Sequence, residues 1–398
     1  MVNIIVLALV GFMAMASGAN AAGFRLSEQD AKANGMGNSF VAVADNASAV
    51  WYNPAAMTEL EKTNLSLGTV MVAPAMKHEF TGGSDEIKNT LHIPPYLYAT
   101  HRLNEKWALG FGFNAPFGLS TEWNKTTART RFVATLSDIK ALNYNINGAY
   151  KLNDKLSFGL GADYVSLDAK LYQSAGGVNE IQLSGDGTGW GYNAAAFYKL
   201  NKKWSFGANY RSPVKVLISG TAKNTAASTS NHASTSITLP DTFQAGAAYK
   251  ANAKWLVSAT ADYTDWATYH ALKINSATFG GTAISYKGWQ SVWAFRLGTE
   301  YKYSDKWNFR AGTFYDWNPV KEKYFETRVP DSDRVAFSLG AGYVVAKNIT
   351  VDLSYTYLMF VERTIHNSVQ DDTGIPTALN GKYKTSAHLP ALGVNYKF

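Results

Sequence analysis

The sequence predicts an all-β membrane protein, a fourteen-stranded antiparallel transmembrane β-barrel with an N-terminal plug (hatch) in its lumen. Three observations predict this fold: a polar turn that recurs six times, long segments in which apolar and polar residues alternate, and an N-terminal segment without that alternation. The first two describe a barrel wall, and the third describes what fills the barrel. The 398 residues contain no cysteine, so neither a disulfide nor a thiolate site is expected.

The recurring turn consists of a bulky residue, a short polar stretch with a lysine, and a large apolar residue. Successive lysines lie 49, 48, 51, 52 and 41 residues apart. The six copies are Arg102–Trp107, Lys151–Leu156, Lys199–Trp204, Lys250–Trp255, Lys302–Trp307 and Val345–Ile349. Six tight turns join twelve strands, and the segments before the first turn and after the last supply one strand each. The expected count is therefore fourteen.

The segments between the turns alternate with the two-residue period of a strand that has unlike faces. After Trp204, one predicted face holds Trp204, Phe206, Ala208, Tyr210, Val214, Val216 and Ile218, and the other holds Ser205, Gly207, Asn209, Arg211 and Lys215. Such segments are longer than the roughly 5–6 residues usual in soluble sheets. A charge facing lipid costs roughly 2–4 kcal/mol near the bilayer midplane. We therefore expect the charged face to line the lumen.

Aromatic residues support a membrane location. Trp107, Trp204, Trp255 and Trp307 all lie at the turn end of their strands, where an interfacial aromatic belt is expected. The last residues alternate toward Phe398, as in the terminal strand of bacterial outer-membrane proteins. A soluble kelch propeller also repeats about every 50 residues. Its blades have four strands, however, whereas each unit here offers two long strands.

The N-terminal sixty residues divide into two parts. Met1–Ala21 combines an apolar run with small residues near its end and is interpreted as a signal peptide, although no Lys or Arg precedes the run. Residues 22–61 lack a strand period and are rich in Ala, Asn and Gly, which favours an ordered plug in the lumen. Residues 62–398 then form the barrel.

Several motifs occur in the order in which they stand in a known family. They are Ala22-Gly23-Phe24-Arg25-Leu26, Gly35-Met36-Gly37, Ala44-Asp45-Asn46-Ala47, Asn53-Pro54-Ala55, Ser137-Asp138-Ile139-Lys140, Tyr210-Arg211-Ser212-Pro213-Val214-Lys215, Leu239-Pro240-Asp241, Thr264-Asp265-Trp266 and Pro330-Asp331-Ser332-Asp333-Arg334. Together they resemble the FadL family (OMPP1/FadL/TodX) from Ala22 to Phe398. That family comprises outer-membrane transporters of long-chain fatty acids and, in related branches, of monoaromatic hydrocarbons such as toluene.

The resemblance implies a fourteen-stranded barrel in the bacterial outer membrane, an N-terminal hatch, and sideways release of substrate through a gap in the third strand. The sequence supports the gap. The strand that opens at Trp107 runs into Asn114, Pro116, Phe117 and Gly118, and proline cannot donate a ladder hydrogen bond. We expect these four residues to form a lateral gate.

A carboxylate substrate would need a fixed cation along the route. The predicted lumenal candidates are Arg211, Lys215, Arg296 and Arg334, and the resemblance favours Arg211 first and Lys215 second. The alternative is that such cations pair with Asp163, Asp262, Glu300 or Asp352 and tie the plug to the wall. Asn53, Pro54 and Ala55 are expected to anchor or hinge the hatch.

The sequence is compatible with two classes of substrate. Long-chain fatty acids are favoured, and passive transport suffices because burial of each CH₂ is worth about 0.8 kcal/mol. However, the predicted loop from Leu171 to Gly187 is shorter than the helical hairpin of fatty-acid transporters, which keeps monoaromatic hydrocarbons as the alternative.

Other functions find less support. The seven histidines show no metal-ligand spacing and no Gly-x-Ser-x-Gly motif occurs, so we expect neither an enzyme nor a cofactor, although an outer-membrane lipase stays an alternative. The formal charge of +7 forms no basic run, so no nucleic-acid partner is expected. A plug argues against a non-specific porin. The expected partners are a hydrophobic small molecule, outer-membrane lipid and lipopolysaccharide, and the expected state is a monomer.

Overall fold

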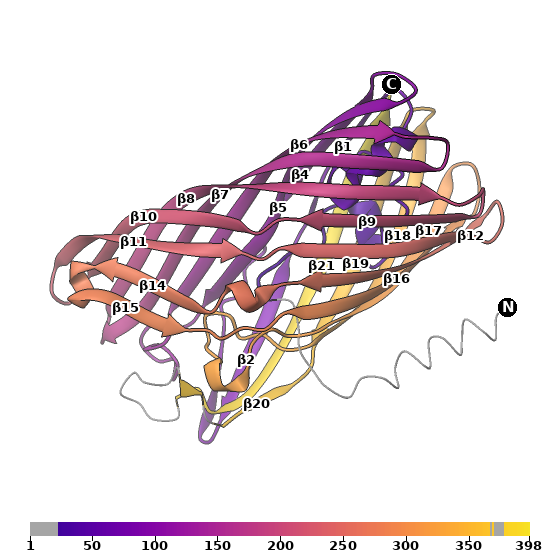
Figure 1. Cartoon of the computed structure of the whole chain (residues 1–398). Helices are drawn as coiled ribbons and strands as arrows, with labels where there is room; N and C mark the ends of the chain where they lie inside the picture. The colour runs from indigo at the N-terminus through magenta and orange to yellow at the C-terminus, as the bar shows by residue number, and fades with distance from the viewer. Residues whose placement is uncertain (1–22, 367, 370–377) are drawn as a thin grey trace.

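The computed structural model describes residues 23–366, 368–369 and 378–398, so the predicted signal peptide Met1–Ala21 lies outside the described residues. The chain forms an antiparallel β-barrel, which confirms the barrel of the predicted fold class (Figure 1). The barrel closes where the first strand, β1 (Thr63–Val70), pairs with the last, β21 (Gly381–Lys397). Closure leaves no unpaired edge to face hydrocarbon.

The wall has the predicted fourteen strands, six of which are interrupted and carry two labels. In chain order they are β1 (Thr63–Val70) with β2 (Ala73–Phe80), β3 (Gly83–Glu86) with β4 (Pro95–Arg102), β5 (Trp107–Glu122), β6 (Leu136–Lys151), β7 (Leu156–Gly176), β8 (Asn179–Lys199), β9 (Trp204–Arg211) with β10 (Val214–Asn224), β11 (Thr229–Leu239) with β12 (Thr242–Lys250), β13 (Trp255–Thr264) with β14 (Ala271–Ser276), β15 (Gly281–Tyr286) with β16 (Val292–Lys302), β17 (Trp307–Asp316), β18 (Arg334–Ala346), β19 (Ile349–Phe360) and β21 (Gly381–Lys397). A further short strand, β20 (Arg363–Ile365), pairs with β21.

Helices in the described residues are short. The N-terminal segment holds α2 (Ala31–Gly35), α3 (Ala49–Tyr52) and the 3₁₀ helix η1 (Pro54–Glu59). The loops hold η2 (Trp266–Thr268), η3 (Ala277–Phe279) and η4 (Glu322–Tyr324). Within the described ranges, none of the helices has the length and apolar character required to cross a membrane.

Five of the predicted turns share one hydrogen-bonded conformation. In the first, the Asn104 side-chain oxygen accepts from the backbone N–H groups of Lys106 and Trp107, both at 2.9 Å. In the other four turns, the side-chain oxygen that accepts the two equivalent hydrogen bonds belongs to Asn153, Asn201, Asn252 or Ser304. Such side-chain-capped turns explain why a short polar residue recurs two positions before the lysine. We call the end of the barrel with these turns the turn end, and the opposite end the loop end.

The predicted aromatic belt is present on the outer surface at the turn end. Each tryptophan packs against a tyrosine across the strand pair, with ring centroids 4.5–4.7 Å apart. The pairs are Trp107–Tyr150, Trp204–Tyr249, Trp255–Tyr301 and Trp307–Tyr343. These side chains remain partly exposed because the outer face meets the membrane rather than a protein core.

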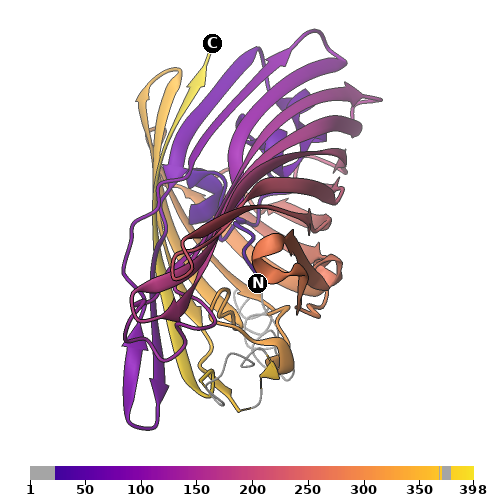
Figure 2. The same ribbon diagram turned by 90° about the vertical axis from the view of Figure 1, so that its left-hand side faces the viewer.

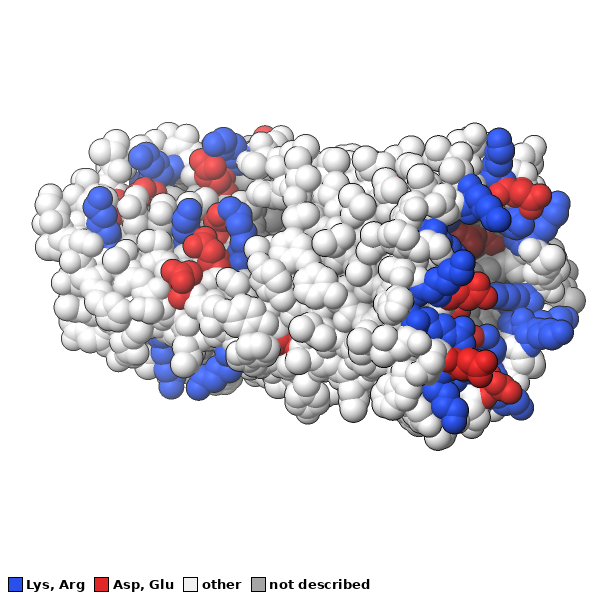
Figure 3. All heavy atoms as spheres, turned by 90° about the horizontal axis from the view of Figure 1, so that it is seen from above, with Lys and Arg blue, Asp and Glu red and all other residues white. Residues whose placement is uncertain are grey.

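A second group of aromatic residues, which sequence reasoning did not identify, lies further along the strands. Tyr263 and Trp293 pair at 5.1 Å, eight residues beyond Trp255 on the same strand. Eight residues at about 3.3 Å each span about 26 Å along the strand, which the strand tilt reduces to about 20 Å of height, close to an apolar band of about 25 Å. Figure 3 shows a largely uncharged band between two charged ends, as expected for the membrane-facing surface.

Two expectations about strands are wrong. The first is the loop from Leu171 to Gly187, because β7 and β8 continue through it as paired strands of 21 residues that turn at Gly177. The second is the face assigned to Lys215. Strand β9 ends at Arg211, and after Ser212-Pro213 the inward positions of β10 are Val214 and Val216, both buried. Lys215 is exposed on the opposite, outer face.

The N-terminal segment lies inside the ring of strands, as the indigo ribbon in Figure 2 shows. Most of residues 23–60 are buried. The segment approaches the wall closely at glycines: a Cβ at Gly312 would lie 2.2 Å from the Gly37 nitrogen, and one at Gly207 would lie 2.0 Å from the Val41 carbonyl oxygen. Only glycine allows such contact between the segment and the wall.

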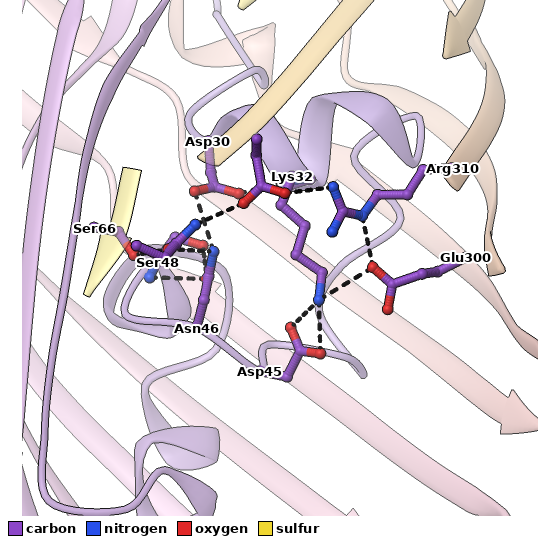
Figure 4. Close-up of polar contacts among 11 residues, drawn as sticks. Asp30, Lys32, Asp45, Asn46, Ser48, Ser66, Glu300 and Arg310 are labelled. Carbon is purple, nitrogen blue, oxygen red and sulfur yellow. Dashed lines mark hydrogen bonds and ion pairs between the residues drawn. The ribbon is translucent and has the colours of Figure 1, made fainter. Parts of the chain in front are cut away.

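Ion pairs also join this segment to the wall (Figure 4). Lys32 contacts Asp45 at 2.8 Å and Glu300 at 3.3 Å, and Glu300 in turn pairs with Arg310 at 2.6 Å. Arg310 also pairs with Asp352 at 2.6 Å. The chain between α2 and α3 is thereby connected to β16, β17 and β19. Asp45 is exposed, but the other four charges are largely desolvated, so removing one of those partners would leave an uncompensated buried charge.

Candidate functional site

Strand β5 is irregular at the predicted gate. Asn114 pairs with Asn143 of β6, and the next pair is Phe117 with Ala141, so β5 contains one extra residue here. Pairing with β4 on the other side stops at Phe113. A β-bulge of this kind bends the strand and leaves backbone groups without ladder partners. The kink predicted from Pro116 is thus visible as a bulge at Ala115-Pro116.

The N-terminal segment satisfies the backbone groups that the bulge leaves unpaired. The Leu26 N–H donates to the Pro116 carbonyl at 2.8 Å, and the Gly118 N–H donates to the Phe24 carbonyl at 3.0 Å. The Gln29 side-chain amide donates to the Ala115 carbonyl at 3.0 Å. Unpaired buried backbone groups raise the free energy of the folded state. By supplying hydrogen-bond partners, the N-terminal segment stabilises the bulged conformation of β5.

The wall is interrupted next to this bulge. Among the described residues, no backbone hydrogen bond joins 114–121 of β5 to 89–96, and the next connection is from the Lys88 N–H to the Glu122 carbonyl at 2.8 Å. A cavity of about 580 Å³ occupies the interruption. Its lining includes lumenal Phe24 together with Leu91 and Ile93, which are 52% and 58% exposed. The cavity is therefore lined both by a buried side chain of the N-terminal segment and by exposed residues of the segment before β4.

Phe24 lies at the inner end of this cavity within an aromatic cage. Its ring contacts those of Phe117, Trp266, Tyr269 and Trp289 at centroid distances of 4.7–6.1 Å, mostly edge-to-face. Edge-to-face pairs of this kind are each worth roughly 0.5–1.5 kcal/mol beyond burial. The cage holds the first described residues of the chain against the bulge.

The backbone before Phe24 is fixed by charged groups. The Gly23 N–H donates to Asp331 at 2.7 Å, and its carbonyl accepts from Arg334 at 2.5 Å. Arg334 also pairs with Asp331 at 3.0 Å and lies over the Phe360 ring, 4.8 Å from its centroid. Of the four predicted ligand-binding cations, Arg334 is the one that lines the 580 Å³ cavity.

Two smaller cavities flank the cage. One, of about 70 Å³, is lined mainly by aliphatic residues of β6, β7, β10 and β11, and its lining also includes Phe24, Glu326 and Arg328. The other, of about 50 Å³, lies beside Arg211 and Phe117. Phe24 and Phe117 also line the large cavity. Movement of these two rings would join the three spaces into one path.

Arg211 and Arg296 are engaged by protein groups. Arg211 pairs with Asp163 at 2.7 Å, donates to the Trp51 carbonyl at 2.9 Å and lies 3.8 Å from the Trp51 ring centroid. Arg296 is fully buried and pairs with Asp262 at 3.2 Å. Asp262 also receives a bidentate contact from Arg25. These arrangements correspond to the alternative in which lumenal cations tie the N-terminal segment to the wall.

The three predicted hatch residues form a capped turn against β7 and β8. The Asn53 side chain accepts from the Ala55 N–H at 3.2 Å and donates to the Val41 and Ala196 carbonyls. Pro54 occupies the first turn of η1. A Cβ at Gly159 of β7 would lie 2.6 Å from the Ala55 nitrogen. Asn53 thus connects two parts of the N-terminal segment with the barrel.

The family model for "Outer membrane protein transport protein (OMPP1/FadL/TodX)" matches residues 12–398 of the chain. The protein belongs to the FadL family. FadL-family proteins are transporters of the bacterial outer membrane, so the turn end of the barrel faces the periplasm and the loop end faces the exterior.

Curated relatives and solved structures agree with this assignment. The "Long-chain fatty acid transport protein" of Salmonella typhi is 28% identical over 384 residues, covering 85% of this chain and 87% of the relative. "Outer membrane protein P1" of Haemophilus influenzae is 27% identical and covers 96% of both chains. The crystal structure of a Pseudomonas aeruginosa FadL homologue has a TM-score of 0.84 at 20% identity, covering 95% of this chain and all of the other. The Ralstonia pickettii toluene transporter TbuX has a TM-score of 0.73 at 17% identity, covering 93% and 98%. At these identities the structures establish the fold alone.

Sequence reasoning missed Arg328, one of the cations inside this FadL-family barrel. Arg328 lies in the segment before β18 and donates to the Tyr172 carbonyl at 3.2 Å and to the Gln173 side chain at 2.8 Å. It forms no ion pair within the described part of the chain, since nearby Glu326 pairs with Lys287. Burial lowers the pKa of Arg328, and Glu326 offsets this only in part. Among the described residues, Arg328 is thus a partly buried cation without a paired carboxylate in the lining of a largely apolar cavity.

Gln29 was missed as well. It holds three positions of the bulge region together by contacting Leu26, Ala115 and Asn114. A glutamine in a segment without periodicity carries no pattern that would single it out. Its role depends on a long-range approach of the N-terminal segment to β5, which a single sequence does not encode in any local motif.

Proposed function

We propose that this FadL-family protein transports long-chain fatty acids passively across the outer membrane and releases them sideways through the interruption at β5. The observation that carries the proposal is the 580 Å³ cavity, which is lined by both lumenal and outward-facing apolar residues. A fatty acid that leaves there enters hydrocarbon directly and avoids the polar periplasmic end. The relatives named as long-chain fatty acid transport proteins support this substrate class.

The N-terminal segment would act as the gate. Residues 31–60 are joined to the wall by the Lys32, Glu300 and Arg310 network. Residues 23–26 are held by the aromatic cage, by four hydrogen bonds of their backbone or of the adjoining β5 backbone, and by the bidentate pair of Arg25 with Asp262. Displacing Phe24 would empty the cage and connect the 580 Å³ cavity with the 70 Å³ cavity, and movement of Phe117 would add the 50 Å³ cavity. The remainder of the segment would stay in place and keep the lumen occluded. Each barrel has its own gap, so we propose that the monomer suffices.

Arg328 is our proposed contact for the substrate carboxylate, in place of Arg211. A charged carboxylate prefers a cation that has no anion already bound, and Arg328 offers one beside an apolar cavity. The acyl tail would extend along the aliphatic residues toward Phe24. Arg211, by contrast, would have to give up Asp163 before it could bind a ligand.

Monoaromatic hydrocarbons remain the second candidate because of one observation. The Phe24 ring occupies a site enclosed by four other aromatic rings, two of them Trp266 and Trp289. If Phe24 moves out, the space it leaves has the size and surroundings that suit a single benzene ring. A toluene-type ligand would need no cation there.

Uptake measurements distinguish the two substrate classes. Cells that lack other transporters of this family and express the parent, Arg328→Ala or Arg328→Lys are supplied with labelled oleate or toluene. We expect oleate uptake to be lost in Arg328→Ala, retained in Arg328→Lys, and toluene uptake to be the same in all three. Absence of oleate uptake in the parent, with toluene uptake present, would establish the second candidate.

A further inference from the structure

The turn end of the barrel carries an excess of positive charge. Fourteen basic residues lie in the turns and at the adjacent strand ends, against five acidic residues. The basic residues are Lys62, Arg102, Lys106, Lys151, Lys155, Lys199, Lys202, Lys203, Lys250, Lys254, Lys302, Lys306, Lys347 and Lys397, and the acidic ones are Glu59, Glu61, Glu105, Asp154 and Asp305. This local excess of nine is larger than the net charge of +7 of the whole chain. On the face seen in Figure 3, basic and some acidic side chains are gathered at the right-hand end.

Five of the lysines occupy equivalent positions around the barrel. Each follows the side chain that caps its turn by two residues and immediately precedes the first residue of the next strand. They are Lys106, Lys155, Lys203, Lys254 and Lys306. The shared turn conformation places all five at one level along the barrel, next to the girdle of Trp–Tyr pairs.

These five turn lysines have no anionic partner within the described chain. All five are exposed and none forms an ion pair. Nearby lysines do find partners: Lys151 and Lys199 contact Glu59, and Lys302 contacts Asp305 at 2.9 Å. A ring of unpaired cations beside an interfacial aromatic girdle lies at the depth of lipid head groups, and lysine can extend its ammonium to that level.

We propose that the five turn lysines bind anionic phospholipid head groups of the periplasmic leaflet. A leaflet surrounds the whole barrel, as these lysines do, whereas a protein partner would cover one sector. The inference is independent of which compound is transported. Basic residues near an anionic lipid surface contribute about 1 kcal/mol each, which corresponds to roughly fivefold in lipid affinity per engaged lysine.

The purified full-length protein, reconstituted in vesicles of phosphatidylcholine mixed with phosphatidylglycerol, is extracted gently and its retained lipids are quantified by mass spectrometry. We expect phosphatidylglycerol to be enriched several-fold in the retained lipid over its share in the vesicle, with enrichment lost at about 1 M salt, where the Debye length falls to about 3 Å. Replacing the five turn lysines with glutamine should abolish enrichment, and replacing them with arginine should preserve it.

Two matched variants complete the test. Glutamine at five lysines of the loop-end half, Lys77, Lys88, Lys170, Lys215 and Lys273, should leave enrichment unchanged. Glutamine at Lys62, Lys202 and Lys397, which line a cavity of about 700 Å³ at the periplasmic mouth together with the turn lysine Lys203, should also leave it unchanged. Enrichment that survives in the turn variant, or that depends on either of these two sets instead, would overturn the proposal. A thermal unfolding midpoint equal to that of the parent protein confirms that each variant is folded.

Discussion

The Leu26 N–H donates a hydrogen bond of 2.8 Å to the Pro116 carbonyl. The N-terminal segment thus supplies a backbone partner to β5 where β5 is no longer paired with β4. The adjacent bond from the Gly118 N–H to the Phe24 carbonyl makes this a short antiparallel bridge. The residues that fill the inner end of the 580 Å³ cavity are therefore the same residues that stabilise the bulge. Displacing them both opens the cavity and removes backbone partners from β5, which couples the gate to the wall.

Deleting Ala115 removes the extra residue of the bulge and should restore continuous pairing of β5 with β6. We expect oleate uptake to fall to the level of cells without the protein, because a straightened β5 would lie alongside residues 89–96 and close the interruption on its β4 side. Pro116→Ala is the matched control, since it keeps the extra residue and should retain uptake. Heat-dependent migration in gels verifies that both variants form barrels. Parental uptake after the deletion would show that substrate leaves elsewhere.

Gln29→Ala should loosen the bridge between the N-terminal segment and β5. The substitution leaves the buried Leu26 and Ala115 carbonyls without the amide that contacts them, at a cost of roughly 1–3 kcal/mol. Hydrogen exchange of the Leu26 and Gly118 amides should accelerate roughly tenfold or more. Ser27→Ala, which removes only a contact with Glu28, should leave these rates unchanged. Equal rates in parent and Gln29→Ala would contradict the role of Gln29.

Arg211→Ala should destabilise the protein rather than alter its substrate preference. The change leaves the buried Asp163 carboxylate without its cation, which costs roughly 3–5 kcal/mol. Chemical denaturation in lipid vesicles measures the loss. The double variant Arg211→Met with Asp163→Asn should recover much of it, because no uncompensated charge remains. Parental stability combined with loss of oleate uptake in Arg211→Ala would instead identify Arg211 as a ligand contact.

Asp30 should make the stability of the N-terminal segment depend on pH. It caps α2 by accepting from the Ala33 N–H at 2.9 Å, and burial raises the pKa of Asp30 to about 6. A raised pKa means that the folded state favours the protonated acid, so this contribution is fully present below the unfolded pKa near 3.8 and is lost as pH rises through about 6. Protection of the α2 amides, corrected for intrinsic exchange, should therefore be greater at pH 5 than at pH 7 by roughly 1 kcal/mol. Asp30→Asn should remove the difference, and a pH dependence that persists in this variant would contradict the assignment.

The barrel could be predicted because its determinants are local. The turn that ends at Trp107 contains its own cap, Asn104, and the same short pattern returns at four further turns. Pro116 marked the irregular strand for an equally local reason, since it lacks an N–H. The aromatic belt at the turn end followed from the tryptophans that open the strands.

The sites were less predictable because they depend on contacts between distant segments. Lys215 was assigned to the lumen by continuing one alternation across Ser212-Pro213, where the strand is interrupted and the inward face changes. Arg328 lies in a connection without periodicity, and its lack of a carboxylate partner is evident only once Glu326 and Lys287 are seen to pair. Composition alone could not distinguish a free cation from one that is already neutralised.

Photocrosslinking measures the exit route most directly. Cells that take up a diazirine derivative of oleate are irradiated, and the labelled residues are mapped by mass spectrometry. Sideways release through the β5 interruption predicts label on Phe117 inside the wall and on Leu91 and Ile93 at its outer mouth. Label confined to the periplasmic mouth, at Ala42, Leu60 or Leu256, would show that substrate passes down through the lumen and would contradict the lateral route.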